Sequence, residues 1–278
     1  MTRFVVRVHA GEQNFLITTN LMDVSIEPIF LTTTKVDRLS GKVDSGSATG
    51  FFYTRNDKTY LITNKHVIYG DNFSDEGAEP QIDKVRLTLH ATSSDLSQNT
   101  DHIIDLFDKE KPVWKEHKNK EVDIIAIPLE LDRSKFHFVT VADDLIDADG
   151  LKIGFEKIFI MGYPLGWHDA QHNLPISRIG HLSSPFRVPF NGKPFMLGDV
   201  ETHKGMSGSP VFMHLKDYVT IGEDGGLTTN LGASKFILLG VYSGQPLWRL
   251  PDTITNDIKS VPHSLSVIWF STLLREII

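Results

Sequence analysis

Short apolar or alternating runs fill much of the chain, and each has the length of a strand rather than of a helix. In the first half they cover residues 4–8, 14–18, 49–53, 60–63, 85–89, 103–107 and 122–128. Turn-rich stretches at residues 40–46, 55–58 and 69–77 separate them. This rhythm predicts an antiparallel barrel or sandwich.

The acidic segment at residues 142–150 interrupts the pattern, and we expect two halves, residues 1–141 and 142–278, to meet near it. Strand patterns then resume at residues 157–162, 176–183, 195–199, 210–214 and 236–242. Only residues 264–278 have a helical pattern, with Ser264 as a candidate N-cap and apolar spacings of three and four. The sequence therefore predicts an all-β protein that ends in an α-helix.

Composition narrows the function classes. The 278 residues are 40% hydrophobic and 23% charged, near the average for soluble globular proteins, and no apolar run approaches the length of a membrane span. A net charge of -7 lacks the basic stripe that nucleic-acid binding requires. The chain has no cysteine, which excludes disulfides, thiolate metal sites and a cysteine nucleophile. We expect neither a membrane nor a nucleic acid as partner.

The N-terminus carries a few alternating apolar residues but not the apolar core of a signal peptide. Together with the absence of cysteine, this predicts a cytoplasmic protein. A mature secreted form whose leader has been removed stays open. The oligomeric state also stays open.

Three short motifs contain the candidate catalytic residues His66, Asp123 and Ser207. Acyl transfer from an amide needs a nucleophile, a base that takes its proton, and an acid group that orients the base and stabilises its cation. Serine, histidine and aspartate supply these roles. Their order along the chain, His then Asp then Ser, is that of chymotrypsin-like enzymes and not of subtilisins or α/β-hydrolases.

The glycine before the nucleophile has its own chemical role. Gly205 allows the backbone to approach a substrate carbonyl, so that its N–H and that of Ser207 can point at the oxyanion that develops during attack. In well-studied enzymes each such donor contributes roughly 2.7–4 kcal/mol to transition-state stabilisation. We therefore predict these two N–H groups as the oxyanion hole.

On these motifs the chain resembles the chymotrypsin-like, or trypsin-like, serine peptidases, especially bacterial members with Gly-x-Ser-Gly-Ser-Pro at the nucleophile. Thr202 and the segment at residues 207–212 are similar to the glutamyl endopeptidase branch. The resemblance implies two antiparallel six-stranded β-barrels, with His66 and Asp123 in the first and Ser207 in the second. It also implies protein or peptide substrates and no cofactor.

The resemblance further implies which residues bind substrate. Ser243 and Gly244 fall on the strand that lines the primary specificity pocket, where Ser243 can also hydrogen-bond Asp123. Glu201, Thr202 and Tyr242 are the other pocket positions. Tyr242 stands where the glutamyl branch has a histidine, and Glu201 at the pocket base would favour basic residues. The cleavage preference therefore stays open.

Each motif has a simpler explanation when taken alone. Ser207 could be an ordinary turn serine, His66 a strand-end histidine, and Asp123 a strand-edge charge. His168 and His172 have the i, i+4 spacing of a zinc helix but lie in a loop-like stretch, so no metal site is predicted. Taken together, order and context favour a serine endopeptidase over a catalytically incompetent peptidase-like protein that only binds peptides or partners.

Overall fold

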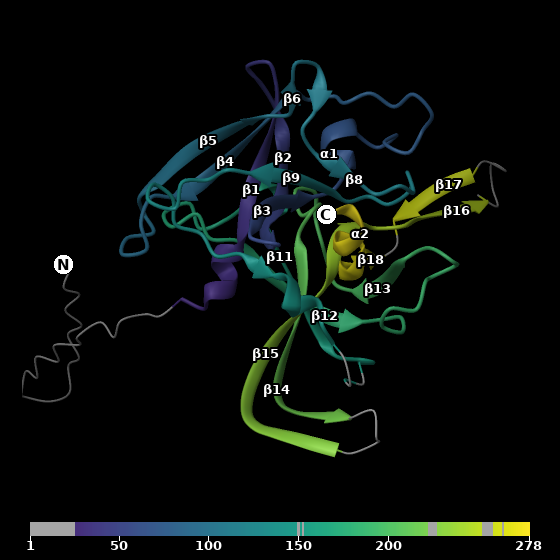
Figure 1. Cartoon of the computed structure of the whole chain (residues 1–278). Helices are drawn as coiled ribbons and strands as arrows, with labels where there is room; N and C mark the ends of the chain where they lie inside the picture. The colour runs from purple at the N-terminus through teal and green to yellow at the C-terminus, as the bar shows by residue number, and fades with distance from the viewer. Residues whose placement is uncertain (1–25, 149–150, 152, 222–226, 252–257, 263) are drawn as a thin grey trace, which may run out of the picture.

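The structure is a computed structural model that describes residues 26–148, 151, 153–221, 227–251, 258–262 and 264–278. The strands predicted at residues 4–8 and 14–18 lie outside the described residues. Two strand-built halves pack against each other, one within residues 33–142 and the other within residues 157–270 (Figure 1). The predicted all-β class is confirmed.

The first half is an eight-stranded sheet. Its strands are β1 (Thr33–Ser40), β2 (Val43–Arg55), β3 (Lys58–Thr63), β4 (Lys84–His90), β5 (Asn99–Asp105), β8 (Lys115–Glu116), β9 (Ile125–Leu129) and β10 (Val141–Ala142). They pair in the order β5-β4-β1-β2-β3-β9-β8, with β10 added beside β2. Among the described strands β5 and β8 do not pair, so this half differs from a closed six-stranded barrel. The short β8 ends the sheet after two residues.

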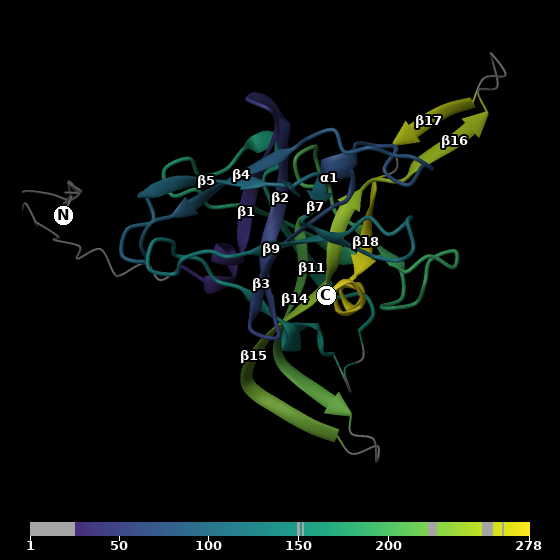
Figure 2. The ribbon, with the colours of Figure 1, turned by 45° about the horizontal axis from the view of Figure 1, so that its top comes forward.

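The second half is a closed barrel of six strands. These are β11 (Lys157–Gly162), β12 (Ile176–Leu182), β13 (Phe195–Asp199), β14 (Pro210–Ile221), β15 (Leu227–Gly244) and β18 (Leu265–Phe270). Figure 2 shows the β14–β15 hairpin projecting well beyond the barrel. Both strands are longer than the sequence predicted, because polar residues continue the ladder outside the core.

The remaining elements are short. They are β6 (Phe107–Asp108), β7 (Lys111–Pro112), β16 (Leu247–Pro251), β17 (Ile258–Pro262), the 3-10 turns η1 (Pro28–Thr32), η2 (Asp143–Ile146), η3 (Pro164–Gly166) and η4 (Ser271–Leu273), and the helices α1 (His66–Tyr69) and α2 (Leu274–Ile277). Within the described part of the chain, no helix is long and apolar enough to cross a membrane.

Strand β2 connects the two cores through the alternation of its side chains. Phe51 and Tyr53 point into a large core shared with the barrel, whereas Phe52 points into the separate core of the first sheet. This alternation follows from the period of two along a strand. All three side chains are almost fully buried. The two halves therefore share one hydrophobic core, and β2 contributes side chains to it.

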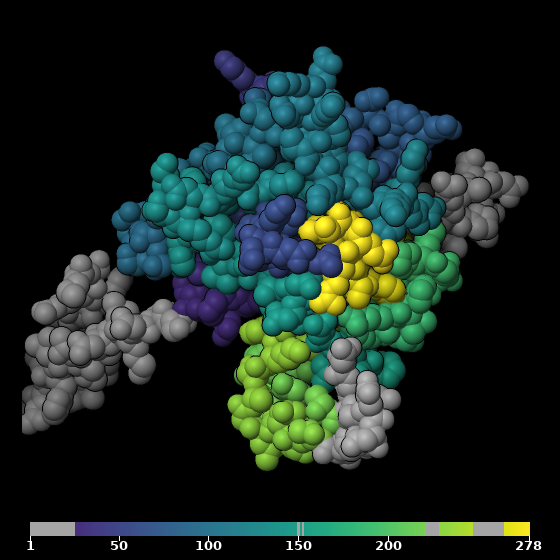
Figure 3. Space-filling model, viewed as in Figure 1, coloured from purple at the N-terminus to yellow at the C-terminus, as the bar shows by residue number. Residues whose placement is uncertain are grey.

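The C-terminal helix is much shorter than predicted. Leu265–Phe270 form strand β18, which pairs with both β13 and β15, and helix α2 covers only Leu274–Ile277. The run of Val267, Ile268 and two aromatic residues has high strand propensity, and an apolar run buried from both sides has no clear period. Figure 3 shows the C-terminal segment filling the junction between the two halves.

The strand predicted at residues 122–128 begins later than expected, at Ile125. Its first residues are drawn out of the ladder, because the backbone carbonyl of Asp123 accepts a hydrogen bond from the Asn64 side chain and its carboxylate binds His66. The departure from the sheet therefore coincides with the candidate site.

Candidate active site

His66 lies on the short helix α1, which a partly buried polar cluster holds in place. Lys65 Nζ lies 2.6 Å from the Glu116 carboxylate, which also accepts hydrogen bonds from the Tyr69 hydroxyl (2.6 Å) and the Trp114 indole (2.7 Å). Burial acts to raise the pKa of Glu116, but these three donors outweigh it and lower the pKa. Glu116 is therefore a stable anion that fixes α1 and the imidazole it carries.

Asp123 is 2% exposed and binds His66 twice. One carboxylate oxygen accepts the His66 backbone N–H (2.9 Å), and the other lies 2.6 Å from His66 Nδ1. The Ser243 hydroxyl donates to the same carboxylate, as the sequence predicted. With Nδ1–H directed at Asp123, a neutral imidazole presents Nε2 as its basic atom. This is the arrangement that a general base requires.

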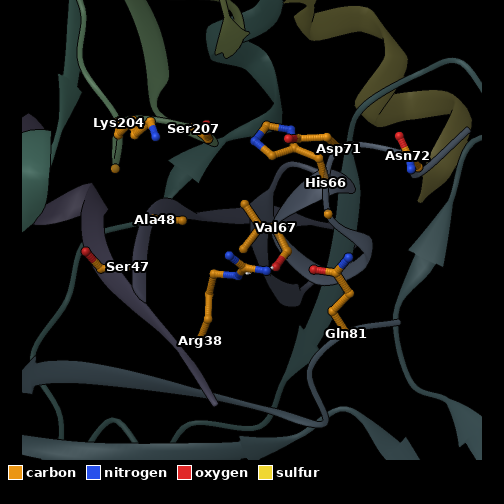
Figure 4. Close-up of a pocket in the computed structure, with 12 residues that line it drawn as sticks. Arg38, Ser47, Ala48, His66, Val67, Asp71, Asn72, Gln81, Lys204 and Ser207 are labelled. Carbon is orange, nitrogen blue, oxygen red and sulfur yellow. Dashed lines mark hydrogen bonds between the residues drawn. The ribbon is translucent and has the colours of Figure 1, made fainter. Parts of the chain in front are cut away.

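Ser207 lies in the turn that precedes β14. Its hydroxyl donates to the Ser243 carbonyl at 3.2 Å. Among the described residues, no hydrogen bond joins this hydroxyl to His66. Both side chains line one pocket, and Figure 4 shows the His66 ring directed toward Ser207. In this rotamer the Ser207 proton is directed at the Ser243 carbonyl, so its transfer to Nε2 requires the Ser207 side chain to turn toward His66.

The N–H groups of Gly205 and Ser207, on either side of Met206 in this turn, have no acceptor among the described residues. The preceding carbonyl, that of Lys204, accepts the Leu165 N–H at 2.6 Å. Because C=O and N–H point in opposite directions across a trans peptide, this contact turns the Gly205 N–H away from Leu165. The geometry suits a preorganised pair of hydrogen-bond donors for an anionic oxygen.

Two glycines in the turn are needed for close backbone approach. Gly205 has φ +92°, and a Cβ there would lie 2.5 Å from the Tyr163 carbonyl. Gly208 has φ +86°, and a Cβ there would lie 2.2 Å from the Thr49 carbonyl. Side chains are excluded at both positions by sterics and by backbone conformation. The 3-10 turn η3 also has a structural role, because the Leu165 N–H supports the Gly205 loop through the Lys204 carbonyl.

Thr49 of β2 joins the two halves at this turn. Its N–H donates to the Ser207 carbonyl (2.9 Å), and its hydroxyl donates to the Gly205 carbonyl (2.8 Å) while accepting the Tyr163 N–H (3.0 Å). Its own carbonyl accepts the Thr63 hydroxyl at 2.8 Å. Thr49 is fully buried. A single residue of the first half therefore fixes the backbone of the nucleophile turn in the second half.

Beside Ser243 lies a neutral, hydrogen-bonded pair. The hydroxyls of Thr202 and Tyr242 are 2.7 Å apart, both residues are buried, and the Gln245 amide donates to Thr202 Oγ1 at 3.4 Å. Burial raises the pKa of the Tyr242 phenol more than the bond with Thr202 lowers it, so the hydroxyl stays neutral. Gly244 lines a separate pocket of about 280 Å³ with Ser243 and Gln245.

Glu201 is not brought to this region. Its side chain is 77% exposed, and its carboxylate pairs with Arg178 on β12 at 2.7 Å. The structure thus gathers His66, Asp123, Ser207 and Ser243, together with the Gly205 turn, and directs Glu201 to solvent. Among the residues that the structure describes, no group of three or more histidine, aspartate or glutamate side chains could hold a metal ion.

Two residues at the site were not singled out by the sequence. Thr49 lies in a run that predicts only a strand, and Asn64 lies two residues before His66 without a signal of its own. Both act on residues distant in the sequence, Gly205 and Asp123.

The profile of the trypsin-like peptidase domain matches residues 48–220. This range includes His66, Asp123 and Ser207. Comparison with curated protein sequences finds no significant match.

Several solved structures are similar to the chain at low identity. A thermostable serine protease, AL20, from an extremophilic microorganism has a TM-score of 0.48 and 12% identity, over 90% of this chain and 97% of that one. A serine endoprotease from Yersinia pestis has a TM-score of 0.45 and 14% identity, over 89% and 61%. The Rv3671c protease of M. tuberculosis in its inactive form has a TM-score of 0.41 and 14% identity, over 89% and 87%.

Proposed function

The chain belongs to the trypsin-like peptidase family, and from this premise we propose that it is a serine endopeptidase that forms an acyl-enzyme on Ser207. In the proposed reaction His66 Nε2 takes the Ser207 proton as Oγ attacks the scissile carbonyl. Asp123 keeps the proton of the neutral imidazole on Nδ1 and stabilises the imidazolium that forms.

The reaction is then completed by release of the amine and by hydrolysis of the acyl-enzyme, and His66 transfers the proton in both steps. Collapse of the tetrahedral intermediate breaks the C–N bond, and His66 gives its proton to the leaving amine. A water molecule, deprotonated by His66, next attacks the ester on Ser207 and releases the acid. Ser207 regains its proton from the imidazolium. The substrates are proteins or peptides.

One observation carries the proposal beyond family membership. The N–H groups of Gly205 and Ser207 have no acceptor among the described residues, while the Lys204 carbonyl is held by Leu165. A collapsed turn would direct a carbonyl at the position that the oxyanion needs. The free state of these two donors supports an active enzyme over a peptidase-like protein that only binds peptides.

The proposal is tested by cleavage of a peptide library, with products identified by mass spectrometry. We expect wild-type protein to cut internal bonds and Ser207→Ala to cut none. Ser209→Ala is the matched control, because the Ser209 hydroxyl is buried without a hydrogen-bond partner and its loss leaves the backbone bonds of the turn intact. A folded wild-type protein that cuts nothing, or equal cutting by Ser207→Ala, would overturn the proposal.

A further inference from the structure

A pocket of about 590 Å³ opens beside Ser207 and His66 (Figure 4), and Ser243 lines the other pocket rather than this one. Its walls come from β1 and β2, from the segment that follows His66, and from the nucleophile turn. The charged residues among its lining, apart from His66, are Arg38, Asp71 and Lys204. Nothing in the proposed catalytic steps uses these three residues.

Arg38 is placed in this pocket by the alternation of β1. The neighbouring residue Asp37 points to the other face, where it pairs with Lys35 (2.9 Å) and Arg86 (2.8 Å). Arg38 Nε donates to the Val67 carbonyl (2.7 Å), and Nη1 donates to the Ser45 carbonyl (3.4 Å). These two carbonyls hold the guanidinium in position without neutralising it.

Arg38 forms no ion pair with any carboxylate of the described residues, unlike Arg86, which pairs with three aspartates. Burial lowers the pKa of Arg38, and the Asp71 carboxylate offsets only part of this effect. A guanidinium has five N–H donors, of which two are used here. Arg38 is therefore a fixed, partly buried cation with capacity to bind a carboxylate in a forked geometry.

The other charges of the pocket leave it positive overall. The exposed Lys204 side chain forms no ion pair or hydrogen bond with the described residues, and the exposed Asp71 forms none either. Two cations thus stand against one anion. Lys204 immediately precedes Gly205, so its side chain leaves the chain next to the predicted oxyanion donors.

The position of the pocket indicates which part of a substrate it receives. The acyl side of a bound peptide would lie along Ser243–Gln245, as the family resemblance implies, and the oxyanion donors fix its carbonyl. The leaving amine must then extend in the opposite direction, past Gly205 and Lys204. We propose that Arg38, assisted by Lys204, binds a carboxylate on the leaving-group side of the scissile bond; this rests on the proposed peptidase function.

Two kinds of substrate present a carboxylate there. One carries aspartate or glutamate at the first or second residue after the scissile bond. The other ends within two residues of that bond, so that its own terminal carboxylate reaches the pocket. The chemistry of recognition is the same in both cases, and the substrates of the experiment separate them.

The test uses quenched fluorescent peptides with one shared acyl side, taken from the best library substrate. One set carries Glu or Gln at each of the first two leaving-group positions, with the C-terminus amidated and distant. A second set ends at the second leaving-group residue as a free acid or as an amide. We expect kcat/KM to favour the carboxylate member of at least one set by about tenfold, the effect of one charge-assisted hydrogen bond.

The variants assign this preference to Arg38. Arg38→Met should reduce the ratio to about one, Arg38→Lys should retain part of it, and Asp71→Asn should raise it because an opposing charge is removed. Lys216→Gln, an exposed lysine on the projecting β14–β15 hairpin, should leave the ratio unchanged. If Arg38→Met does not fold, Asp71→Asn and a fall of the wild-type ratio with added salt still test the proposal.

Equal cleavage of carboxylate and neutral peptides in both sets would overturn the inference while leaving the peptidase proposal intact. So would a preference that persists in folded Arg38→Met. Failure of the peptidase proposal looks different: no peptide is cut by the wild-type protein, whatever its leaving-group residues.

Discussion

The sheet half holds its catalytic groups through side chains, whereas the barrel half holds them through backbone conformation. His66 and Asp123 are fixed by Asn64, by Ser243 and by the Glu116 cluster. The nucleophile turn is instead fixed by two positive-φ glycines and by backbone hydrogen bonds, and the Thr49 hydroxyl of the sheet half supports it from outside the barrel. We therefore expect that deleting side chains impairs catalysis through the sheet half. Added backbone strain should impair catalysis through the barrel half.

The largest effect is expected from His66→Ala, which removes the base from the sheet half. We expect kcat to fall at least about 10⁴-fold, because the Ser207 proton has no acceptor. The double variant with Ser207→Ala should be no worse than either single variant, since base and nucleophile act as one unit. Steady-state kinetics measure both, and additive losses would contradict a shared step.

Gly205→Ala tests the barrel half, because the added methyl group displaces the backbone of the nucleophile turn and removes no side chain. Its Cβ would meet the Tyr163 carbonyl at 2.5 Å, so the N–H should lose its alignment and kcat should fall about 10²–10³-fold. Gly192→Ala is the matched control, because Gly192 also has positive φ (+77°) but nothing lies within 4 Å of its added Cβ. Similar losses of kcat in both variants would show general strain instead of a displaced donor.

Thr49→Val sharpens the comparison by cutting the link from the sheet half to the turn. The substitution keeps the side-chain shape but leaves the Gly205 carbonyl and the Tyr163 N–H without their partner. We expect a loss of about 2–3 kcal/mol in the free energy of unfolding and about tenfold in kcat, with KM little changed. Thr49→Ser should restore kcat, and an unchanged kcat in folded Thr49→Val would contradict the positioning role.

Asp143→Asn tests the contact between the halves away from the site. Asp143 binds Tyr53 of β2 and Arg275 of α2. Burial acts to raise its pKa, but the Arg275 and Tyr53 hydrogen bonds outweigh it and hold the pKa below its usual range. We expect a loss of about 1 kcal/mol in the free energy of unfolding at neutral pH, with kcat/KM unchanged.

The sign of the pH dependence follows from the lowered pKa. The contribution of Asp143 is fully present above its unfolded pKa of about 3.9 and is lost as the pH falls through the folded value. The difference in Tm between wild type and Asp143→Asn should therefore shrink below about pH 4. Asp105→Asn serves as the control, because the Asp105 pair with Lys84 is largely exposed and should contribute little at any pH.

The sequence predicted the strands whose side chains alternate clearly or whose ends have turn residues. The strand β11 at residues 157–162 and the strand β13 at residues 195–199 agree with the structure at both ends. Strand β18 was mistaken for helix because both of its faces are buried, which removes the alternation that identifies a strand. Whether a run is buried on both faces depends on partner strands distant in the sequence.

The same limit applies to the site. The residue types of His66, Asp123 and Ser207 and their order along the chain can both be read from a single sequence. Thr49 and Arg38 are not visible in this way, because each appears as one polar residue in a strand. Their importance depends on which segment packs against that strand, and Thr49 meets Gly205 only after both halves have folded. Side-chain pairing of Glu201 with Arg178 likewise depends on the barrel register.

The central claim is that Ser207 is an activated nucleophile, and covalent labelling tests it most directly. The folded chain is treated with a fluorophosphonate, its intact mass is measured, and the modified peptide is sequenced. We predict one adduct per chain, on Ser207, that is absent from Ser207→Ala and present in Ser209→Ala. A folded wild-type protein that takes up no label, or a label on a serine other than Ser207, would contradict the account.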